Sequence, residues 1–310
     1  MARSLRDLRR KMKAIKSTRQ VTKAMELVSA SKMRRAVSNA QLLRRYALTA
    51  YTILERIAEV APGAHPYLTE KPVGNVLGIL FTSDRGLAGS LNAQMFRAVN
   101  QYVHESKELK SFKKLDFVAV GKKGQQFLAR TGQSVIAAFP ALSNHPKFKE
   151  VIPIARMATD GFLAGTYDHV VLLFSDFVSP LVQNPTVKVL LPFSKSDLRR
   201  MLERFAADRR SKNHQPSTMN QPTSVHEYKF EPSQNGVLEI ILPQLTEIQV
   251  YQAVLEAAAS EHSARMVAMR NATDNASGIL DDLTLTYNQT RQEKITGELA
   301  ELSASKAALE

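Results

Sequence analysis

The sequence predicts an α/β protein in which two long terminal helices pair as an antiparallel coiled coil and a mostly parallel α/β domain lies between them in the chain. Three observations point to this fold. Proline and glycine are absent before Pro62, and proline is absent after Pro243. Both ends repeat small and apolar residues at alternating steps of three and four. Between the ends, short apolar runs alternate with helical patterns.

The composition limits the chemistry that the chain can perform. The 310 residues are 44% hydrophobic, which is ordinary for a chain that buries a sizeable core. Because no cysteine occurs, neither a disulfide framework nor a thiol switch can form. The histidines lack the spacing of a metal site, and the longest apolar runs are far shorter than the roughly 20 residues that span a bilayer. We therefore expect no metal, no cofactor and no membrane-spanning segment.

The net charge of +13 is distributed unevenly along the chain. Residues 1–60 contain 15 Lys and Arg against four Asp and Glu, whereas residues 245–310 contain five against ten. The two ends are electrostatically complementary and are expected to pair with each other. A basic coiled-coil nucleic-acid-binding protein is the alternative interpretation, and it predicts strong, salt-sensitive DNA affinity. The acidic second helix partly cancels the field of the first, which weakens that alternative.

The predicted N-terminal coiled-coil helix occupies residues 1–61. An unbroken helix from Ser4 to Ala61 would be roughly 85 Å long, which no single globular core covers. Its seam is narrow and rich in small residues, so that two helix backbones can approach closely. The seam has slips after Ile15 and Ser29 and consists of Leu8, Met12, Ile15, Thr18, Thr22, Met25, Ser29, Met33, Ala36, Ala40, Leu43, Ala47, Ala50, Leu54 and Ile57.

The predicted C-terminal coiled-coil helix occupies residues 245–310 and follows nearly the same rule. Its seam consists of Ile248, Tyr251, Leu255, Ala258, His262, Arg265, Met269, Ala272, Ala276, Ile279 and Leu283. Matched periods and opposite charges favour an antiparallel pair, in which we expect Met25 near the C-terminal third of this helix. Methionines on the seam are expected to serve core packing.

Residues 72–235 form the predicted central domain. The strand candidates are residues 74–83, 115–121, 133–139 and 168–175, and the helices between them are 88–107, 122–131 and 148–165. This order predicts a mostly parallel, Rossmann-like sheet with helices on its faces. Residues 186–193 and 226–233 are expected to add a hairpin-like pair of edge strands. They flank a polar insertion, residues 194–224, for which the sequence predicts a short helix followed by a solvated loop.

The turn "SDRGLAGSLN", residues 83–92, is the one candidate ligand site of the central domain. It follows the first strand at the carboxyl edge of the sheet, where doubly wound proteins bind nucleotides. Its glycines, Gly86 and Gly89, do not form a G-x-G-x-x-G fingerprint, and no phosphate-loop lysine follows. We therefore expect Asp84, Arg85 and both glycines to belong to a tight strand-to-helix connection with positive φ at glycine. A nucleotide-dependent enzyme is the weaker alternative, since no Ser/His/Asp constellation is visible.

Four stretches of the chain, taken in order, resemble one family. They are "TRQVTKAMELVSASKMRRA", "SDRGLAGSLN", "SARMVAMRNATDNA" and "ITGELAEL". Together they resemble the gamma subunit of the F-type ATP synthase over essentially the full length. The resemblance implies a non-catalytic rotor shaft, which couples transmembrane ion flow to ATP synthesis or hydrolysis by rotating inside the hexameric ring of alpha and beta subunits.

The resemblance also implies further partners and a location. The α/β domain would be a foot that rests on the membrane c-ring and on the epsilon subunit. The chain would then be peripheral to the cytoplasmic face of a bacterial inner membrane, with no catalytic residue, no cofactor and no nucleic-acid partner. The resemblance leaves open whether protons or sodium ions are coupled, because that selectivity lies in the membrane ring.

Six positions match family residues that face the catalytic beta subunits. They are Lys23, Met25, Arg265, Gln292, Thr296 and Glu298. The basic outer face of the first helix would meet acidic beta-subunit loops, and adaptable methionines suit a contact that slides among three related partners. The chain departs from the family at Ser305 and Lys306, where a Gly-Ala pair is usual.

The insertion gives a first testable prediction. Residues 213–224 are rich in Pro, Ser, Asn and Gln and lack apolar periodicity, so we expect them to be mobile. Limited proteolysis of the full chain with mass mapping should place the first cut in this segment. Full protection of the segment would mean that it is docked.

Overall fold

The computed structural model describes residues 4–60, 65–69, 71–72, 74–108, 112–144, 146–193 and 234–307. These residues belong to two compact units. Unit 1 consists of residues 1–31 and 265–310, and unit 2 consists of residues 32–264. Both terminal helices contribute to both units. The insertion 194–224 and the predicted strand 226–233 lie outside the described residues.

Unit 2 is organised around a five-stranded sheet with the order β3-β2-β1-β4-β5. The strands are β1 (Asn75–Phe81), β2 (Lys114–Val120), β3 (Ser134–Phe139), β4 (His169–Phe177) and β5 (Gln183–Leu191). β1 runs parallel to both β2 and β4, and β2 runs parallel to β3, so the predicted mostly parallel sheet is confirmed. β5 is the predicted edge strand, and it pairs antiparallel with β4.

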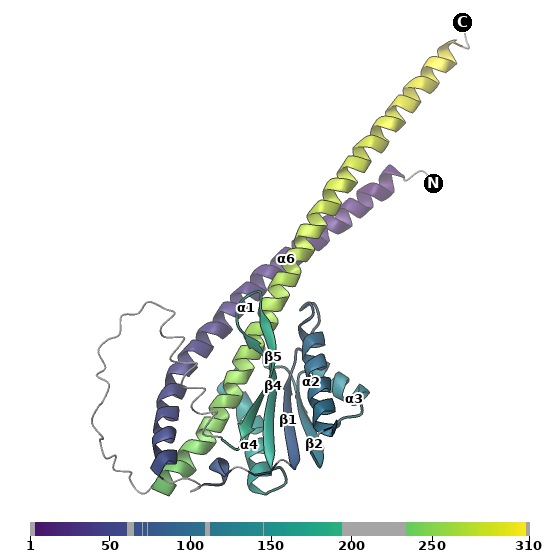
Figure 1. Ribbon diagram of the computed structural model, residues 1–310. Helices are drawn as coiled ribbons and strands as arrows, with labels where there is room; N and C mark the ends of the chain where they lie inside the picture. The colour runs from purple at the N-terminus through teal and green to yellow at the C-terminus, as the bar shows by residue number, and fades with distance from the viewer. Residues whose placement is uncertain are drawn as a thin grey trace, which may run out of the picture. The chain divides into compact units, whose positions relative to one another are not determined.

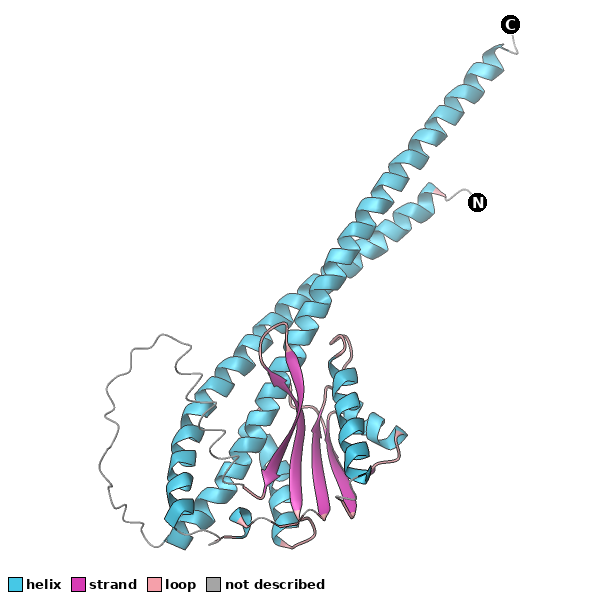
Figure 2. Ribbon diagram, in the orientation of Figure 1, coloured by secondary structure: helices cyan, strands magenta, loops and turns pink. Residues whose placement is uncertain are grey.

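Helices cover both faces of this sheet, as Figures 1 and 2 show. They are α2 (Leu91–Glu108), α3 (Lys122–Arg130), α4 (Phe148–Leu163) and α6 (Gln234–Ala307), and a short 3₁₀ helix, η1 (Pro66–Leu68), precedes the sheet. Successive strand residues point to opposite faces of the sheet, so a buried strand contributes side chains to the core on each face. The core under α2 and α3 contains Val76, Leu80, Met95 and Leu128, and the core under α4 and α6 contains Leu77, Ile79, Ile154 and Leu242.

The helix α6 begins earlier than the sequence pattern predicts. It starts at Gln234 instead of Leu245 and continues through Pro243. A proline inside a helix removes one backbone hydrogen bond and crowds the preceding turn, which is why the pattern favours a later start. Leu238, Leu242 and Leu245 are completely buried against the sheet, and their burial offsets the cost of the proline.

Unit 1 consists of the first part of α1 (Leu5–Val60) packed on the last part of α6. Thr22 contacts Thr273, and Arg9, thirteen residues earlier, contacts Tyr287, fourteen residues later. Contacts that move in opposite directions along the two helices establish the predicted antiparallel pairing. This register places Met25 level with about residue 270, near the middle of α6, so the expectation that Met25 lies near its C-terminal third is wrong.

The seam of unit 1 keeps the predicted three-four steps but uses two different residues. Thr18 is exposed and Arg19 is half-buried, so the step from Ile15 runs to Arg19, and the two successive steps of three move from Met12–Thr18 to Arg19–Met25. On α6, Ile279 is 47% exposed, and the neighbouring Leu280 is half-buried instead. A one-residue choice of this kind depends on the facing helix, which the periodicity of one helix does not contain.

A buried carboxylate lies at the start of β2. The Asp116 side chain has no solvent exposure, and its Oδ2 accepts a hydrogen bond from the Tyr167 hydroxyl at 2.9 Å and contacts the Lys114 ammonium at 2.6 Å. Burial by itself would raise the pKa of Asp116, but hydrogen bonds from Lys114, Ser134 and Tyr167 outweigh it and hold that pKa below its ordinary value. Burial, together with the nearby carboxylate, raises the pKa of Tyr167 to about 12.

The Asp116 cluster predicts a pH-dependent loss of stability in Tyr167→Phe. A carboxylate whose pKa is lowered in the folded state stabilises the fold above its ordinary pKa of 3.8, and this stabilisation is lost as the pH falls below that value. Removing a hydrogen bond to a charged group should lower the free energy of unfolding by about 1.5–3 kcal/mol at neutral pH. Urea denaturation should show this loss shrinking below about pH 4.

Tyr251→Phe is the matched control for this measurement. The Tyr251 hydroxyl donates to the neutral Pro146 carbonyl at 3.1 Å, so its removal should cost about 0.5–1.5 kcal/mol with little dependence on pH. An equal loss for Tyr167→Phe at neutral and acidic pH would contradict the charged role of Asp116.

Candidate functional site

The α1 turn that carries Lys23 and Met25 faces both the seam and the solvent. Met25 is half-buried, whereas the Lys23 side chain is 53% exposed. The Lys23 ammonium lies 3.0 Å from Glu26 Oε2, and the Glu26 side chain is only 14% exposed. This pair balances part of the positive charge within α1 and holds the ammonium at the surface.

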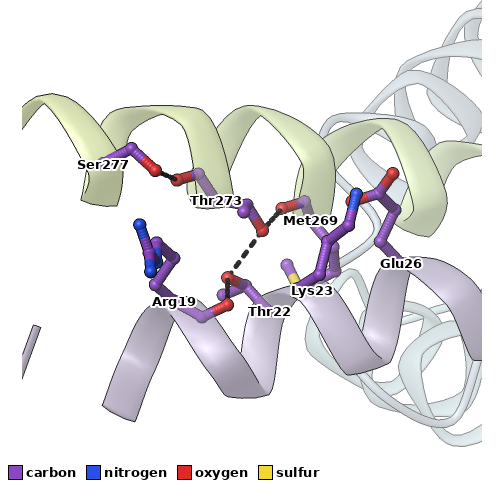
Figure 3. A network of polar contacts seen from close by, with 7 residues as sticks. All are labelled: Arg19, Thr22, Lys23, Glu26, Met269, Thr273 and Ser277. Carbon is purple, nitrogen blue, oxygen red and sulfur yellow. Dashed lines mark hydrogen bonds and ion pairs between the residues drawn. The ribbon is translucent and has the colours of Figure 1, made fainter. Parts of the chain in front are cut away.

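Two threonines join α1 and α6 beside this turn. Figure 3 shows the Oγ1 atoms of Thr22 and Thr273 facing each other across the interface, 2.8 Å apart. Each hydroxyl also approaches a carbonyl oxygen of its own helix, that of Arg19 at 3.0 Å and that of Met269 at 2.8 Å. The Ser277 hydroxyl donates to the backbone carbonyl of Thr273 at 3.1 Å and extends the network along α6.

The other four predicted contact residues lie in two different environments on α6. Arg265 is 9% exposed, so most of its side chain is covered. Gln292, Thr296 and Glu298 belong to a stretch in which every described side chain is exposed, and Glu298 lies 3.6 Å from Lys294. Unit 1 therefore brings Lys23 and Met25 together in one turn and leaves the last three residues on a separate segment.

The last turns of α6 extend past the described end of α1. The register places Ser4 level with about residue 291, so residues 292–305 have no facing residue among those that the structure describes. Ile295, Leu299 and Leu302 are 46–68% exposed and recur at steps of four and three. They form an apolar stripe on one side of this segment, which we call the tip stripe.

The outer surface of α1 in unit 1 is strongly basic. Only Asp7 and Glu26 oppose its cations between residues 4 and 31. The exposed cations are Arg6, Arg9, Arg10, Lys11, Lys13, Lys16 and Lys23. A like-charged stripe of this length attracts acidic partners and repels basic ones.

The turn at residues 83–92 is held by its own polar groups. Asp84 Oδ1 accepts hydrogen bonds from the backbone amides of Lys122 at 2.8 Å and Ala141 at 3.2 Å. It therefore joins the end of β1 to the first residue of α3 and to the segment after β3. A carboxylate at a helix N-terminus is also favoured by the helix dipole. Asp84 has a structural partner for its charge, as the prediction of a tight connection requires.

The backbone of this turn uses positive φ at Gly89, as predicted, but not at Gly86. The φ of Gly89 is 57°, and Leu87 has a φ of 63°, so a leucine takes the second left-handed position. A glycine is required by close packing at Gly121, where the backbone lies against the end of β1. Its φ is 105°, and an added Cβ would lie 2.2 Å from the Thr82 carbonyl oxygen. Only glycine fits between β2 and α3 at that point.

The crevice where doubly wound sheets bind ligands is occupied by α6. The strand order reverses between β1 and β4, and Val254, Ala258 and Glu261 of α6 lie at their carboxyl ends. Ser260 Oγ donates to the Ser175 carbonyl at 2.8 Å and fixes the helix there. The remaining cavity has a volume of about 30 Å³, enough for a water or two but not for a nucleotide.

Relatives of known sequence identify the family of this chain. The sequence model of the ATP synthase family matches residues 4–309. The chain is 42% identical over 309 residues to the ATP synthase gamma chain of Roseiflexus sp. (strain RS-1), covering 99% of this chain and 98% of that one. The chain belongs to the ATP synthase gamma chain family. A gamma chain of Herpetosiphon aurantiacus is 40% identical over 315 residues, covering 99% of both chains.

Solved structures share the fold of this gamma chain. A central stalk and c-ring structure of the Tetrahymena thermophila mitochondrial ATP synthase gives a TM-score of 0.58 at 24% identity, covering 81% of this chain and 99% of that one. A rotor structure from Euglena gracilis gives 0.59 at 21% identity, covering 94% and 98%. At these identities the likeness concerns the fold alone.

As a member of the gamma chain family, this chain is a non-catalytic subunit. Within the described residues, no group of three or more His, Asp or Glu side chains has the arrangement of a metal site. No described helix is long and apolar enough to cross a membrane.

Sequence reasoning missed several hydroxyl residues that hold α6 against its neighbours. Ser260 and Ser263 are completely buried on α6, and Ser263 donates to the Pro180 carbonyl in the β4–β5 turn at 2.7 Å. Thr22 was assigned to the seam, but its pairing with Thr273 was not foreseen. The predicted seam of the last helix contains Ala272 and not Thr273, so the pairing of the two threonines follows only from the register of the helix pair.

Asp84 provides a testable prediction for the foot-domain turn. Asp84→Ala leaves two backbone amides without their acceptor, so it should lower the free energy of unfolding by about 1–2 kcal/mol. Arg85→Ala is the matched control, because Arg85 is exposed and its change should stay within about 0.5 kcal/mol. Denaturant unfolding of the full chain compares the two variants. Equal stability of both variants would mean that Asp84 does not hold the turn together.

Proposed function

We propose that this gamma chain is the rotor shaft of an F-type ATP synthase and couples transmembrane ion flow to ATP synthesis or hydrolysis in the alpha-beta ring. The observation that carries the proposal is the full-length family match, together with a helix pair whose first helix carries a row of exposed cations. A shaft has to transmit torque without chemistry of its own. The filled crevice of the sheet supports that reading against a nucleotide-dependent enzyme.

The surface of unit 1 is suited to a partner with acidic loops. The exposed cations of α1 provide long-range attraction, while Met25 offers an adaptable apolar contact beside Lys23. Such a surface can meet three related beta subunits in turn without binding one of them tightly. We infer that Lys23, Met25 and the covered Arg265 belong to this sliding contact.

The end of α6 is suited to an enclosed position within the ring. Its tip stripe, Ile295, Leu299 and Leu302, would be costly to leave in water along an isolated helix. On the remaining surface, Gln292, Thr296 and Glu298 offer polar contacts. We infer that the ring surrounds this segment.

Unit 2 is proposed to be the foot of the rotor. Its partners would be the membrane c-ring and the epsilon subunit, which places the chain peripherally on the cytoplasmic face of a bacterial inner membrane. The Tetrahymena relative comes from a central stalk and c-ring structure, and this setting supports the proposal.

Native mass spectrometry after co-expression with alpha and beta subunits tests the proposal. One copy of this chain per hexameric ring is expected. Binding measurements with the isolated chain test the alternatives, since a nucleic-acid-binding protein predicts tight, salt-sensitive DNA affinity and an enzyme predicts nucleotide binding. Tight DNA affinity without assembly into the ring would overturn the rotor assignment.

Glu298→Lys predicts a loss of coupling without a loss of folding. Glu298 is 60% exposed and 3.6 Å from Lys294, so breaking this pair should cost less than about 1 kcal/mol of stability. Inside the ring the charge would be repeatedly and partly desolvated, and a reversed sign can cost several kcal/mol at an unfavourable rotor angle. We expect assembled complexes with slower ATP turnover, a steeper temperature dependence and weaker ion pumping.

Glu293→Lys makes the same charge change on another face of the segment, and it should slow turnover less than Glu298→Lys if the contact is specific to the face that carries Glu298. Glu293 lies on the same exposed stretch of α6 but on a different face of the helix. If the Glu298→Lys complex matches the parent in turnover, temperature dependence and pumping, Glu298 does not belong to the rotor's contact surface.

A further inference from the structure

The seam of unit 1 does little by shape alone to fix its own register. Around Thr22 it contains Met25 and Ser29 on α1, and α6 contributes Met269 and Ala276, whereas the larger Leu8, Ile15, Leu280 and Leu283 lie further along the pair. Small side chains leave shallow holes, and methionine adapts to many surroundings, so these residues resist sliding weakly. A polar contact at a seam position is the feature that can distinguish one register from the next.

Thr22 and Thr273 make such a contact at a covered position. Thr22 is 8% exposed, and the two Oγ1 atoms are 2.8 Å apart, as Figure 3 shows. The two hydroxyl protons serve three contacts, because each hydroxyl also approaches a carbonyl of its own helix. Whichever hydroxyl donates across the interface, the other can donate to its own helix. Whichever threonine donates across the interface, the hydrogen bond between α1 and α6 is therefore kept.

Sliding by one helical turn would break this contact without replacing it. The neighbouring seam residues of α6 on either side of Thr273, Met269 and Ala276, carry no hydroxyl, and the hydroxyl of Ser277, one turn further on, already donates to the Thr273 carbonyl. The covered Thr22 hydroxyl would then lose its partner on the facing helix, which costs more at a buried position than at an exposed one. The contact thus favours one axial position of α1 on α6.

A second contact agrees with the same register. The Arg9 guanidinium Nε donates to the Tyr287 hydroxyl at 2.9 Å, and the guanidinium carbon lies 5.3 Å from the centre of the Tyr287 ring. Arg9 and Tyr287 are exposed relative to the threonine pair, so this contact contributes less to holding the register.

We propose that the Thr22–Thr273 hydroxyl pair is a register pin, which blocks axial sliding between α1 and α6 in unit 1. The inference rests on the proposed rotor function for its purpose, because a shaft under torque loses transmitted work when its two strands slide past each other. The pin makes the two helices share the load. Thr22 and Thr273 are positioning residues, which act through the alignment of the surface that touches the ring.

The test uses threonine variants of the full chain with matched controls. Thr22→Val and Thr273→Val remove a hydroxyl at nearly constant shape. Thr18→Val and Thr284→Val are the controls, because both hydroxyls are exposed and donate to a carbonyl of their own helix, at 3.1 and 2.7 Å. Thr22→Ser restores the hydroxyl without the methyl group and should restore wild-type behaviour if the hydroxyl is what matters.

Spin labels measure sliding directly, because the chain contains no cysteine that would compete for the label. Lys13→Cys and Asp282→Cys provide exposed label sites that lie level with each other, nine residues beyond the pin on each helix. We expect a narrow distance distribution in the parent chain. With either valine variant the distribution should broaden or shift, by up to one turn of about 5.4 Å. Unchanged distributions in both valine variants would overturn the proposal.

Hydrogen exchange gives an independent readout of the same contact. The valine variants should lower the protection of residues 5–31 by about 2- to 10-fold, as expected for the loss of one hydrogen bond. Because the two hydroxyls act as a pair, the double variant should lose little more protection than either single variant. Additive losses would mean that each threonine stabilises only its own helix and would contradict the pin.

The assembled complex separates this inference from the proposed function. Rings containing Thr22→Val should hydrolyse ATP at the parent rate but pump fewer ions per ATP against a gradient, while Thr18→Val rings should match the parent. If the parent chain does not assemble with alpha and beta subunits, the proposed function fails, and the spin-label distances still decide the pin. If the labels move and pumping does not change, the inference that the pin serves torque transmission is wrong.

Discussion

The burial of α6 against the central sheet is the interaction on which the rest of unit 2 depends. Leu238, Leu242 and Leu245 are completely buried, and each such side chain contributes about 1.5–3 kcal/mol when it leaves water. This burial offsets the cost of Pro243, which lies inside the helix. Further along, the same helix fills the crevice between β1 and β4 and leaves a cavity of about 30 Å³. One packing arrangement therefore both anchors the helix and removes the ligand site that the fold would otherwise offer.

Unit 1 has no sheet to pack against, and this explains why its seam is built differently. Two helices bury only a narrow stripe, and around Thr22 this stripe consists mainly of small residues and methionines. Close approach of the backbones compensates for the small apolar area, and the contact between Thr22 and Thr273 supplies positional specificity that the side-chain shapes lack. Residues of both α1 and α6 belong to each unit. The same two helices therefore pack in two different ways, in unit 2 in a domain built on a sheet and in unit 1 on each other.

Charged residues serve opposite purposes in the two units. In unit 2 the Asp84 and Asp116 carboxylates are directed inward, where Asp84 Oδ1 accepts from backbone amides and Asp116 Oδ2 accepts from a tyrosine hydroxyl. In unit 1 most cations of α1 are exposed, and the Glu298 side chain is 60% exposed. Exposed charges contribute little to folding but act over long range on a partner. The exposed cations of α1 are therefore available to a partner, whereas the inward-facing Asp84 and Asp116 are not.

The sequence by itself determined the elements and their order. Strand and helix periods are local properties, so the predicted ranges of β1 to β4 and of α2 to α4 agree with the structure to within a few residues. The family resemblance likewise depended on local motifs. Tertiary structure alone decided that α6 begins at Gln234, that Leu280 replaces Ile279 on the seam, and that Asp84 joins α3 to the segment after β3. Each of these choices depends on a partner distant in the chain, because burial and hydrogen bonding are settled by what a residue meets after folding, and the local pattern does not contain that partner.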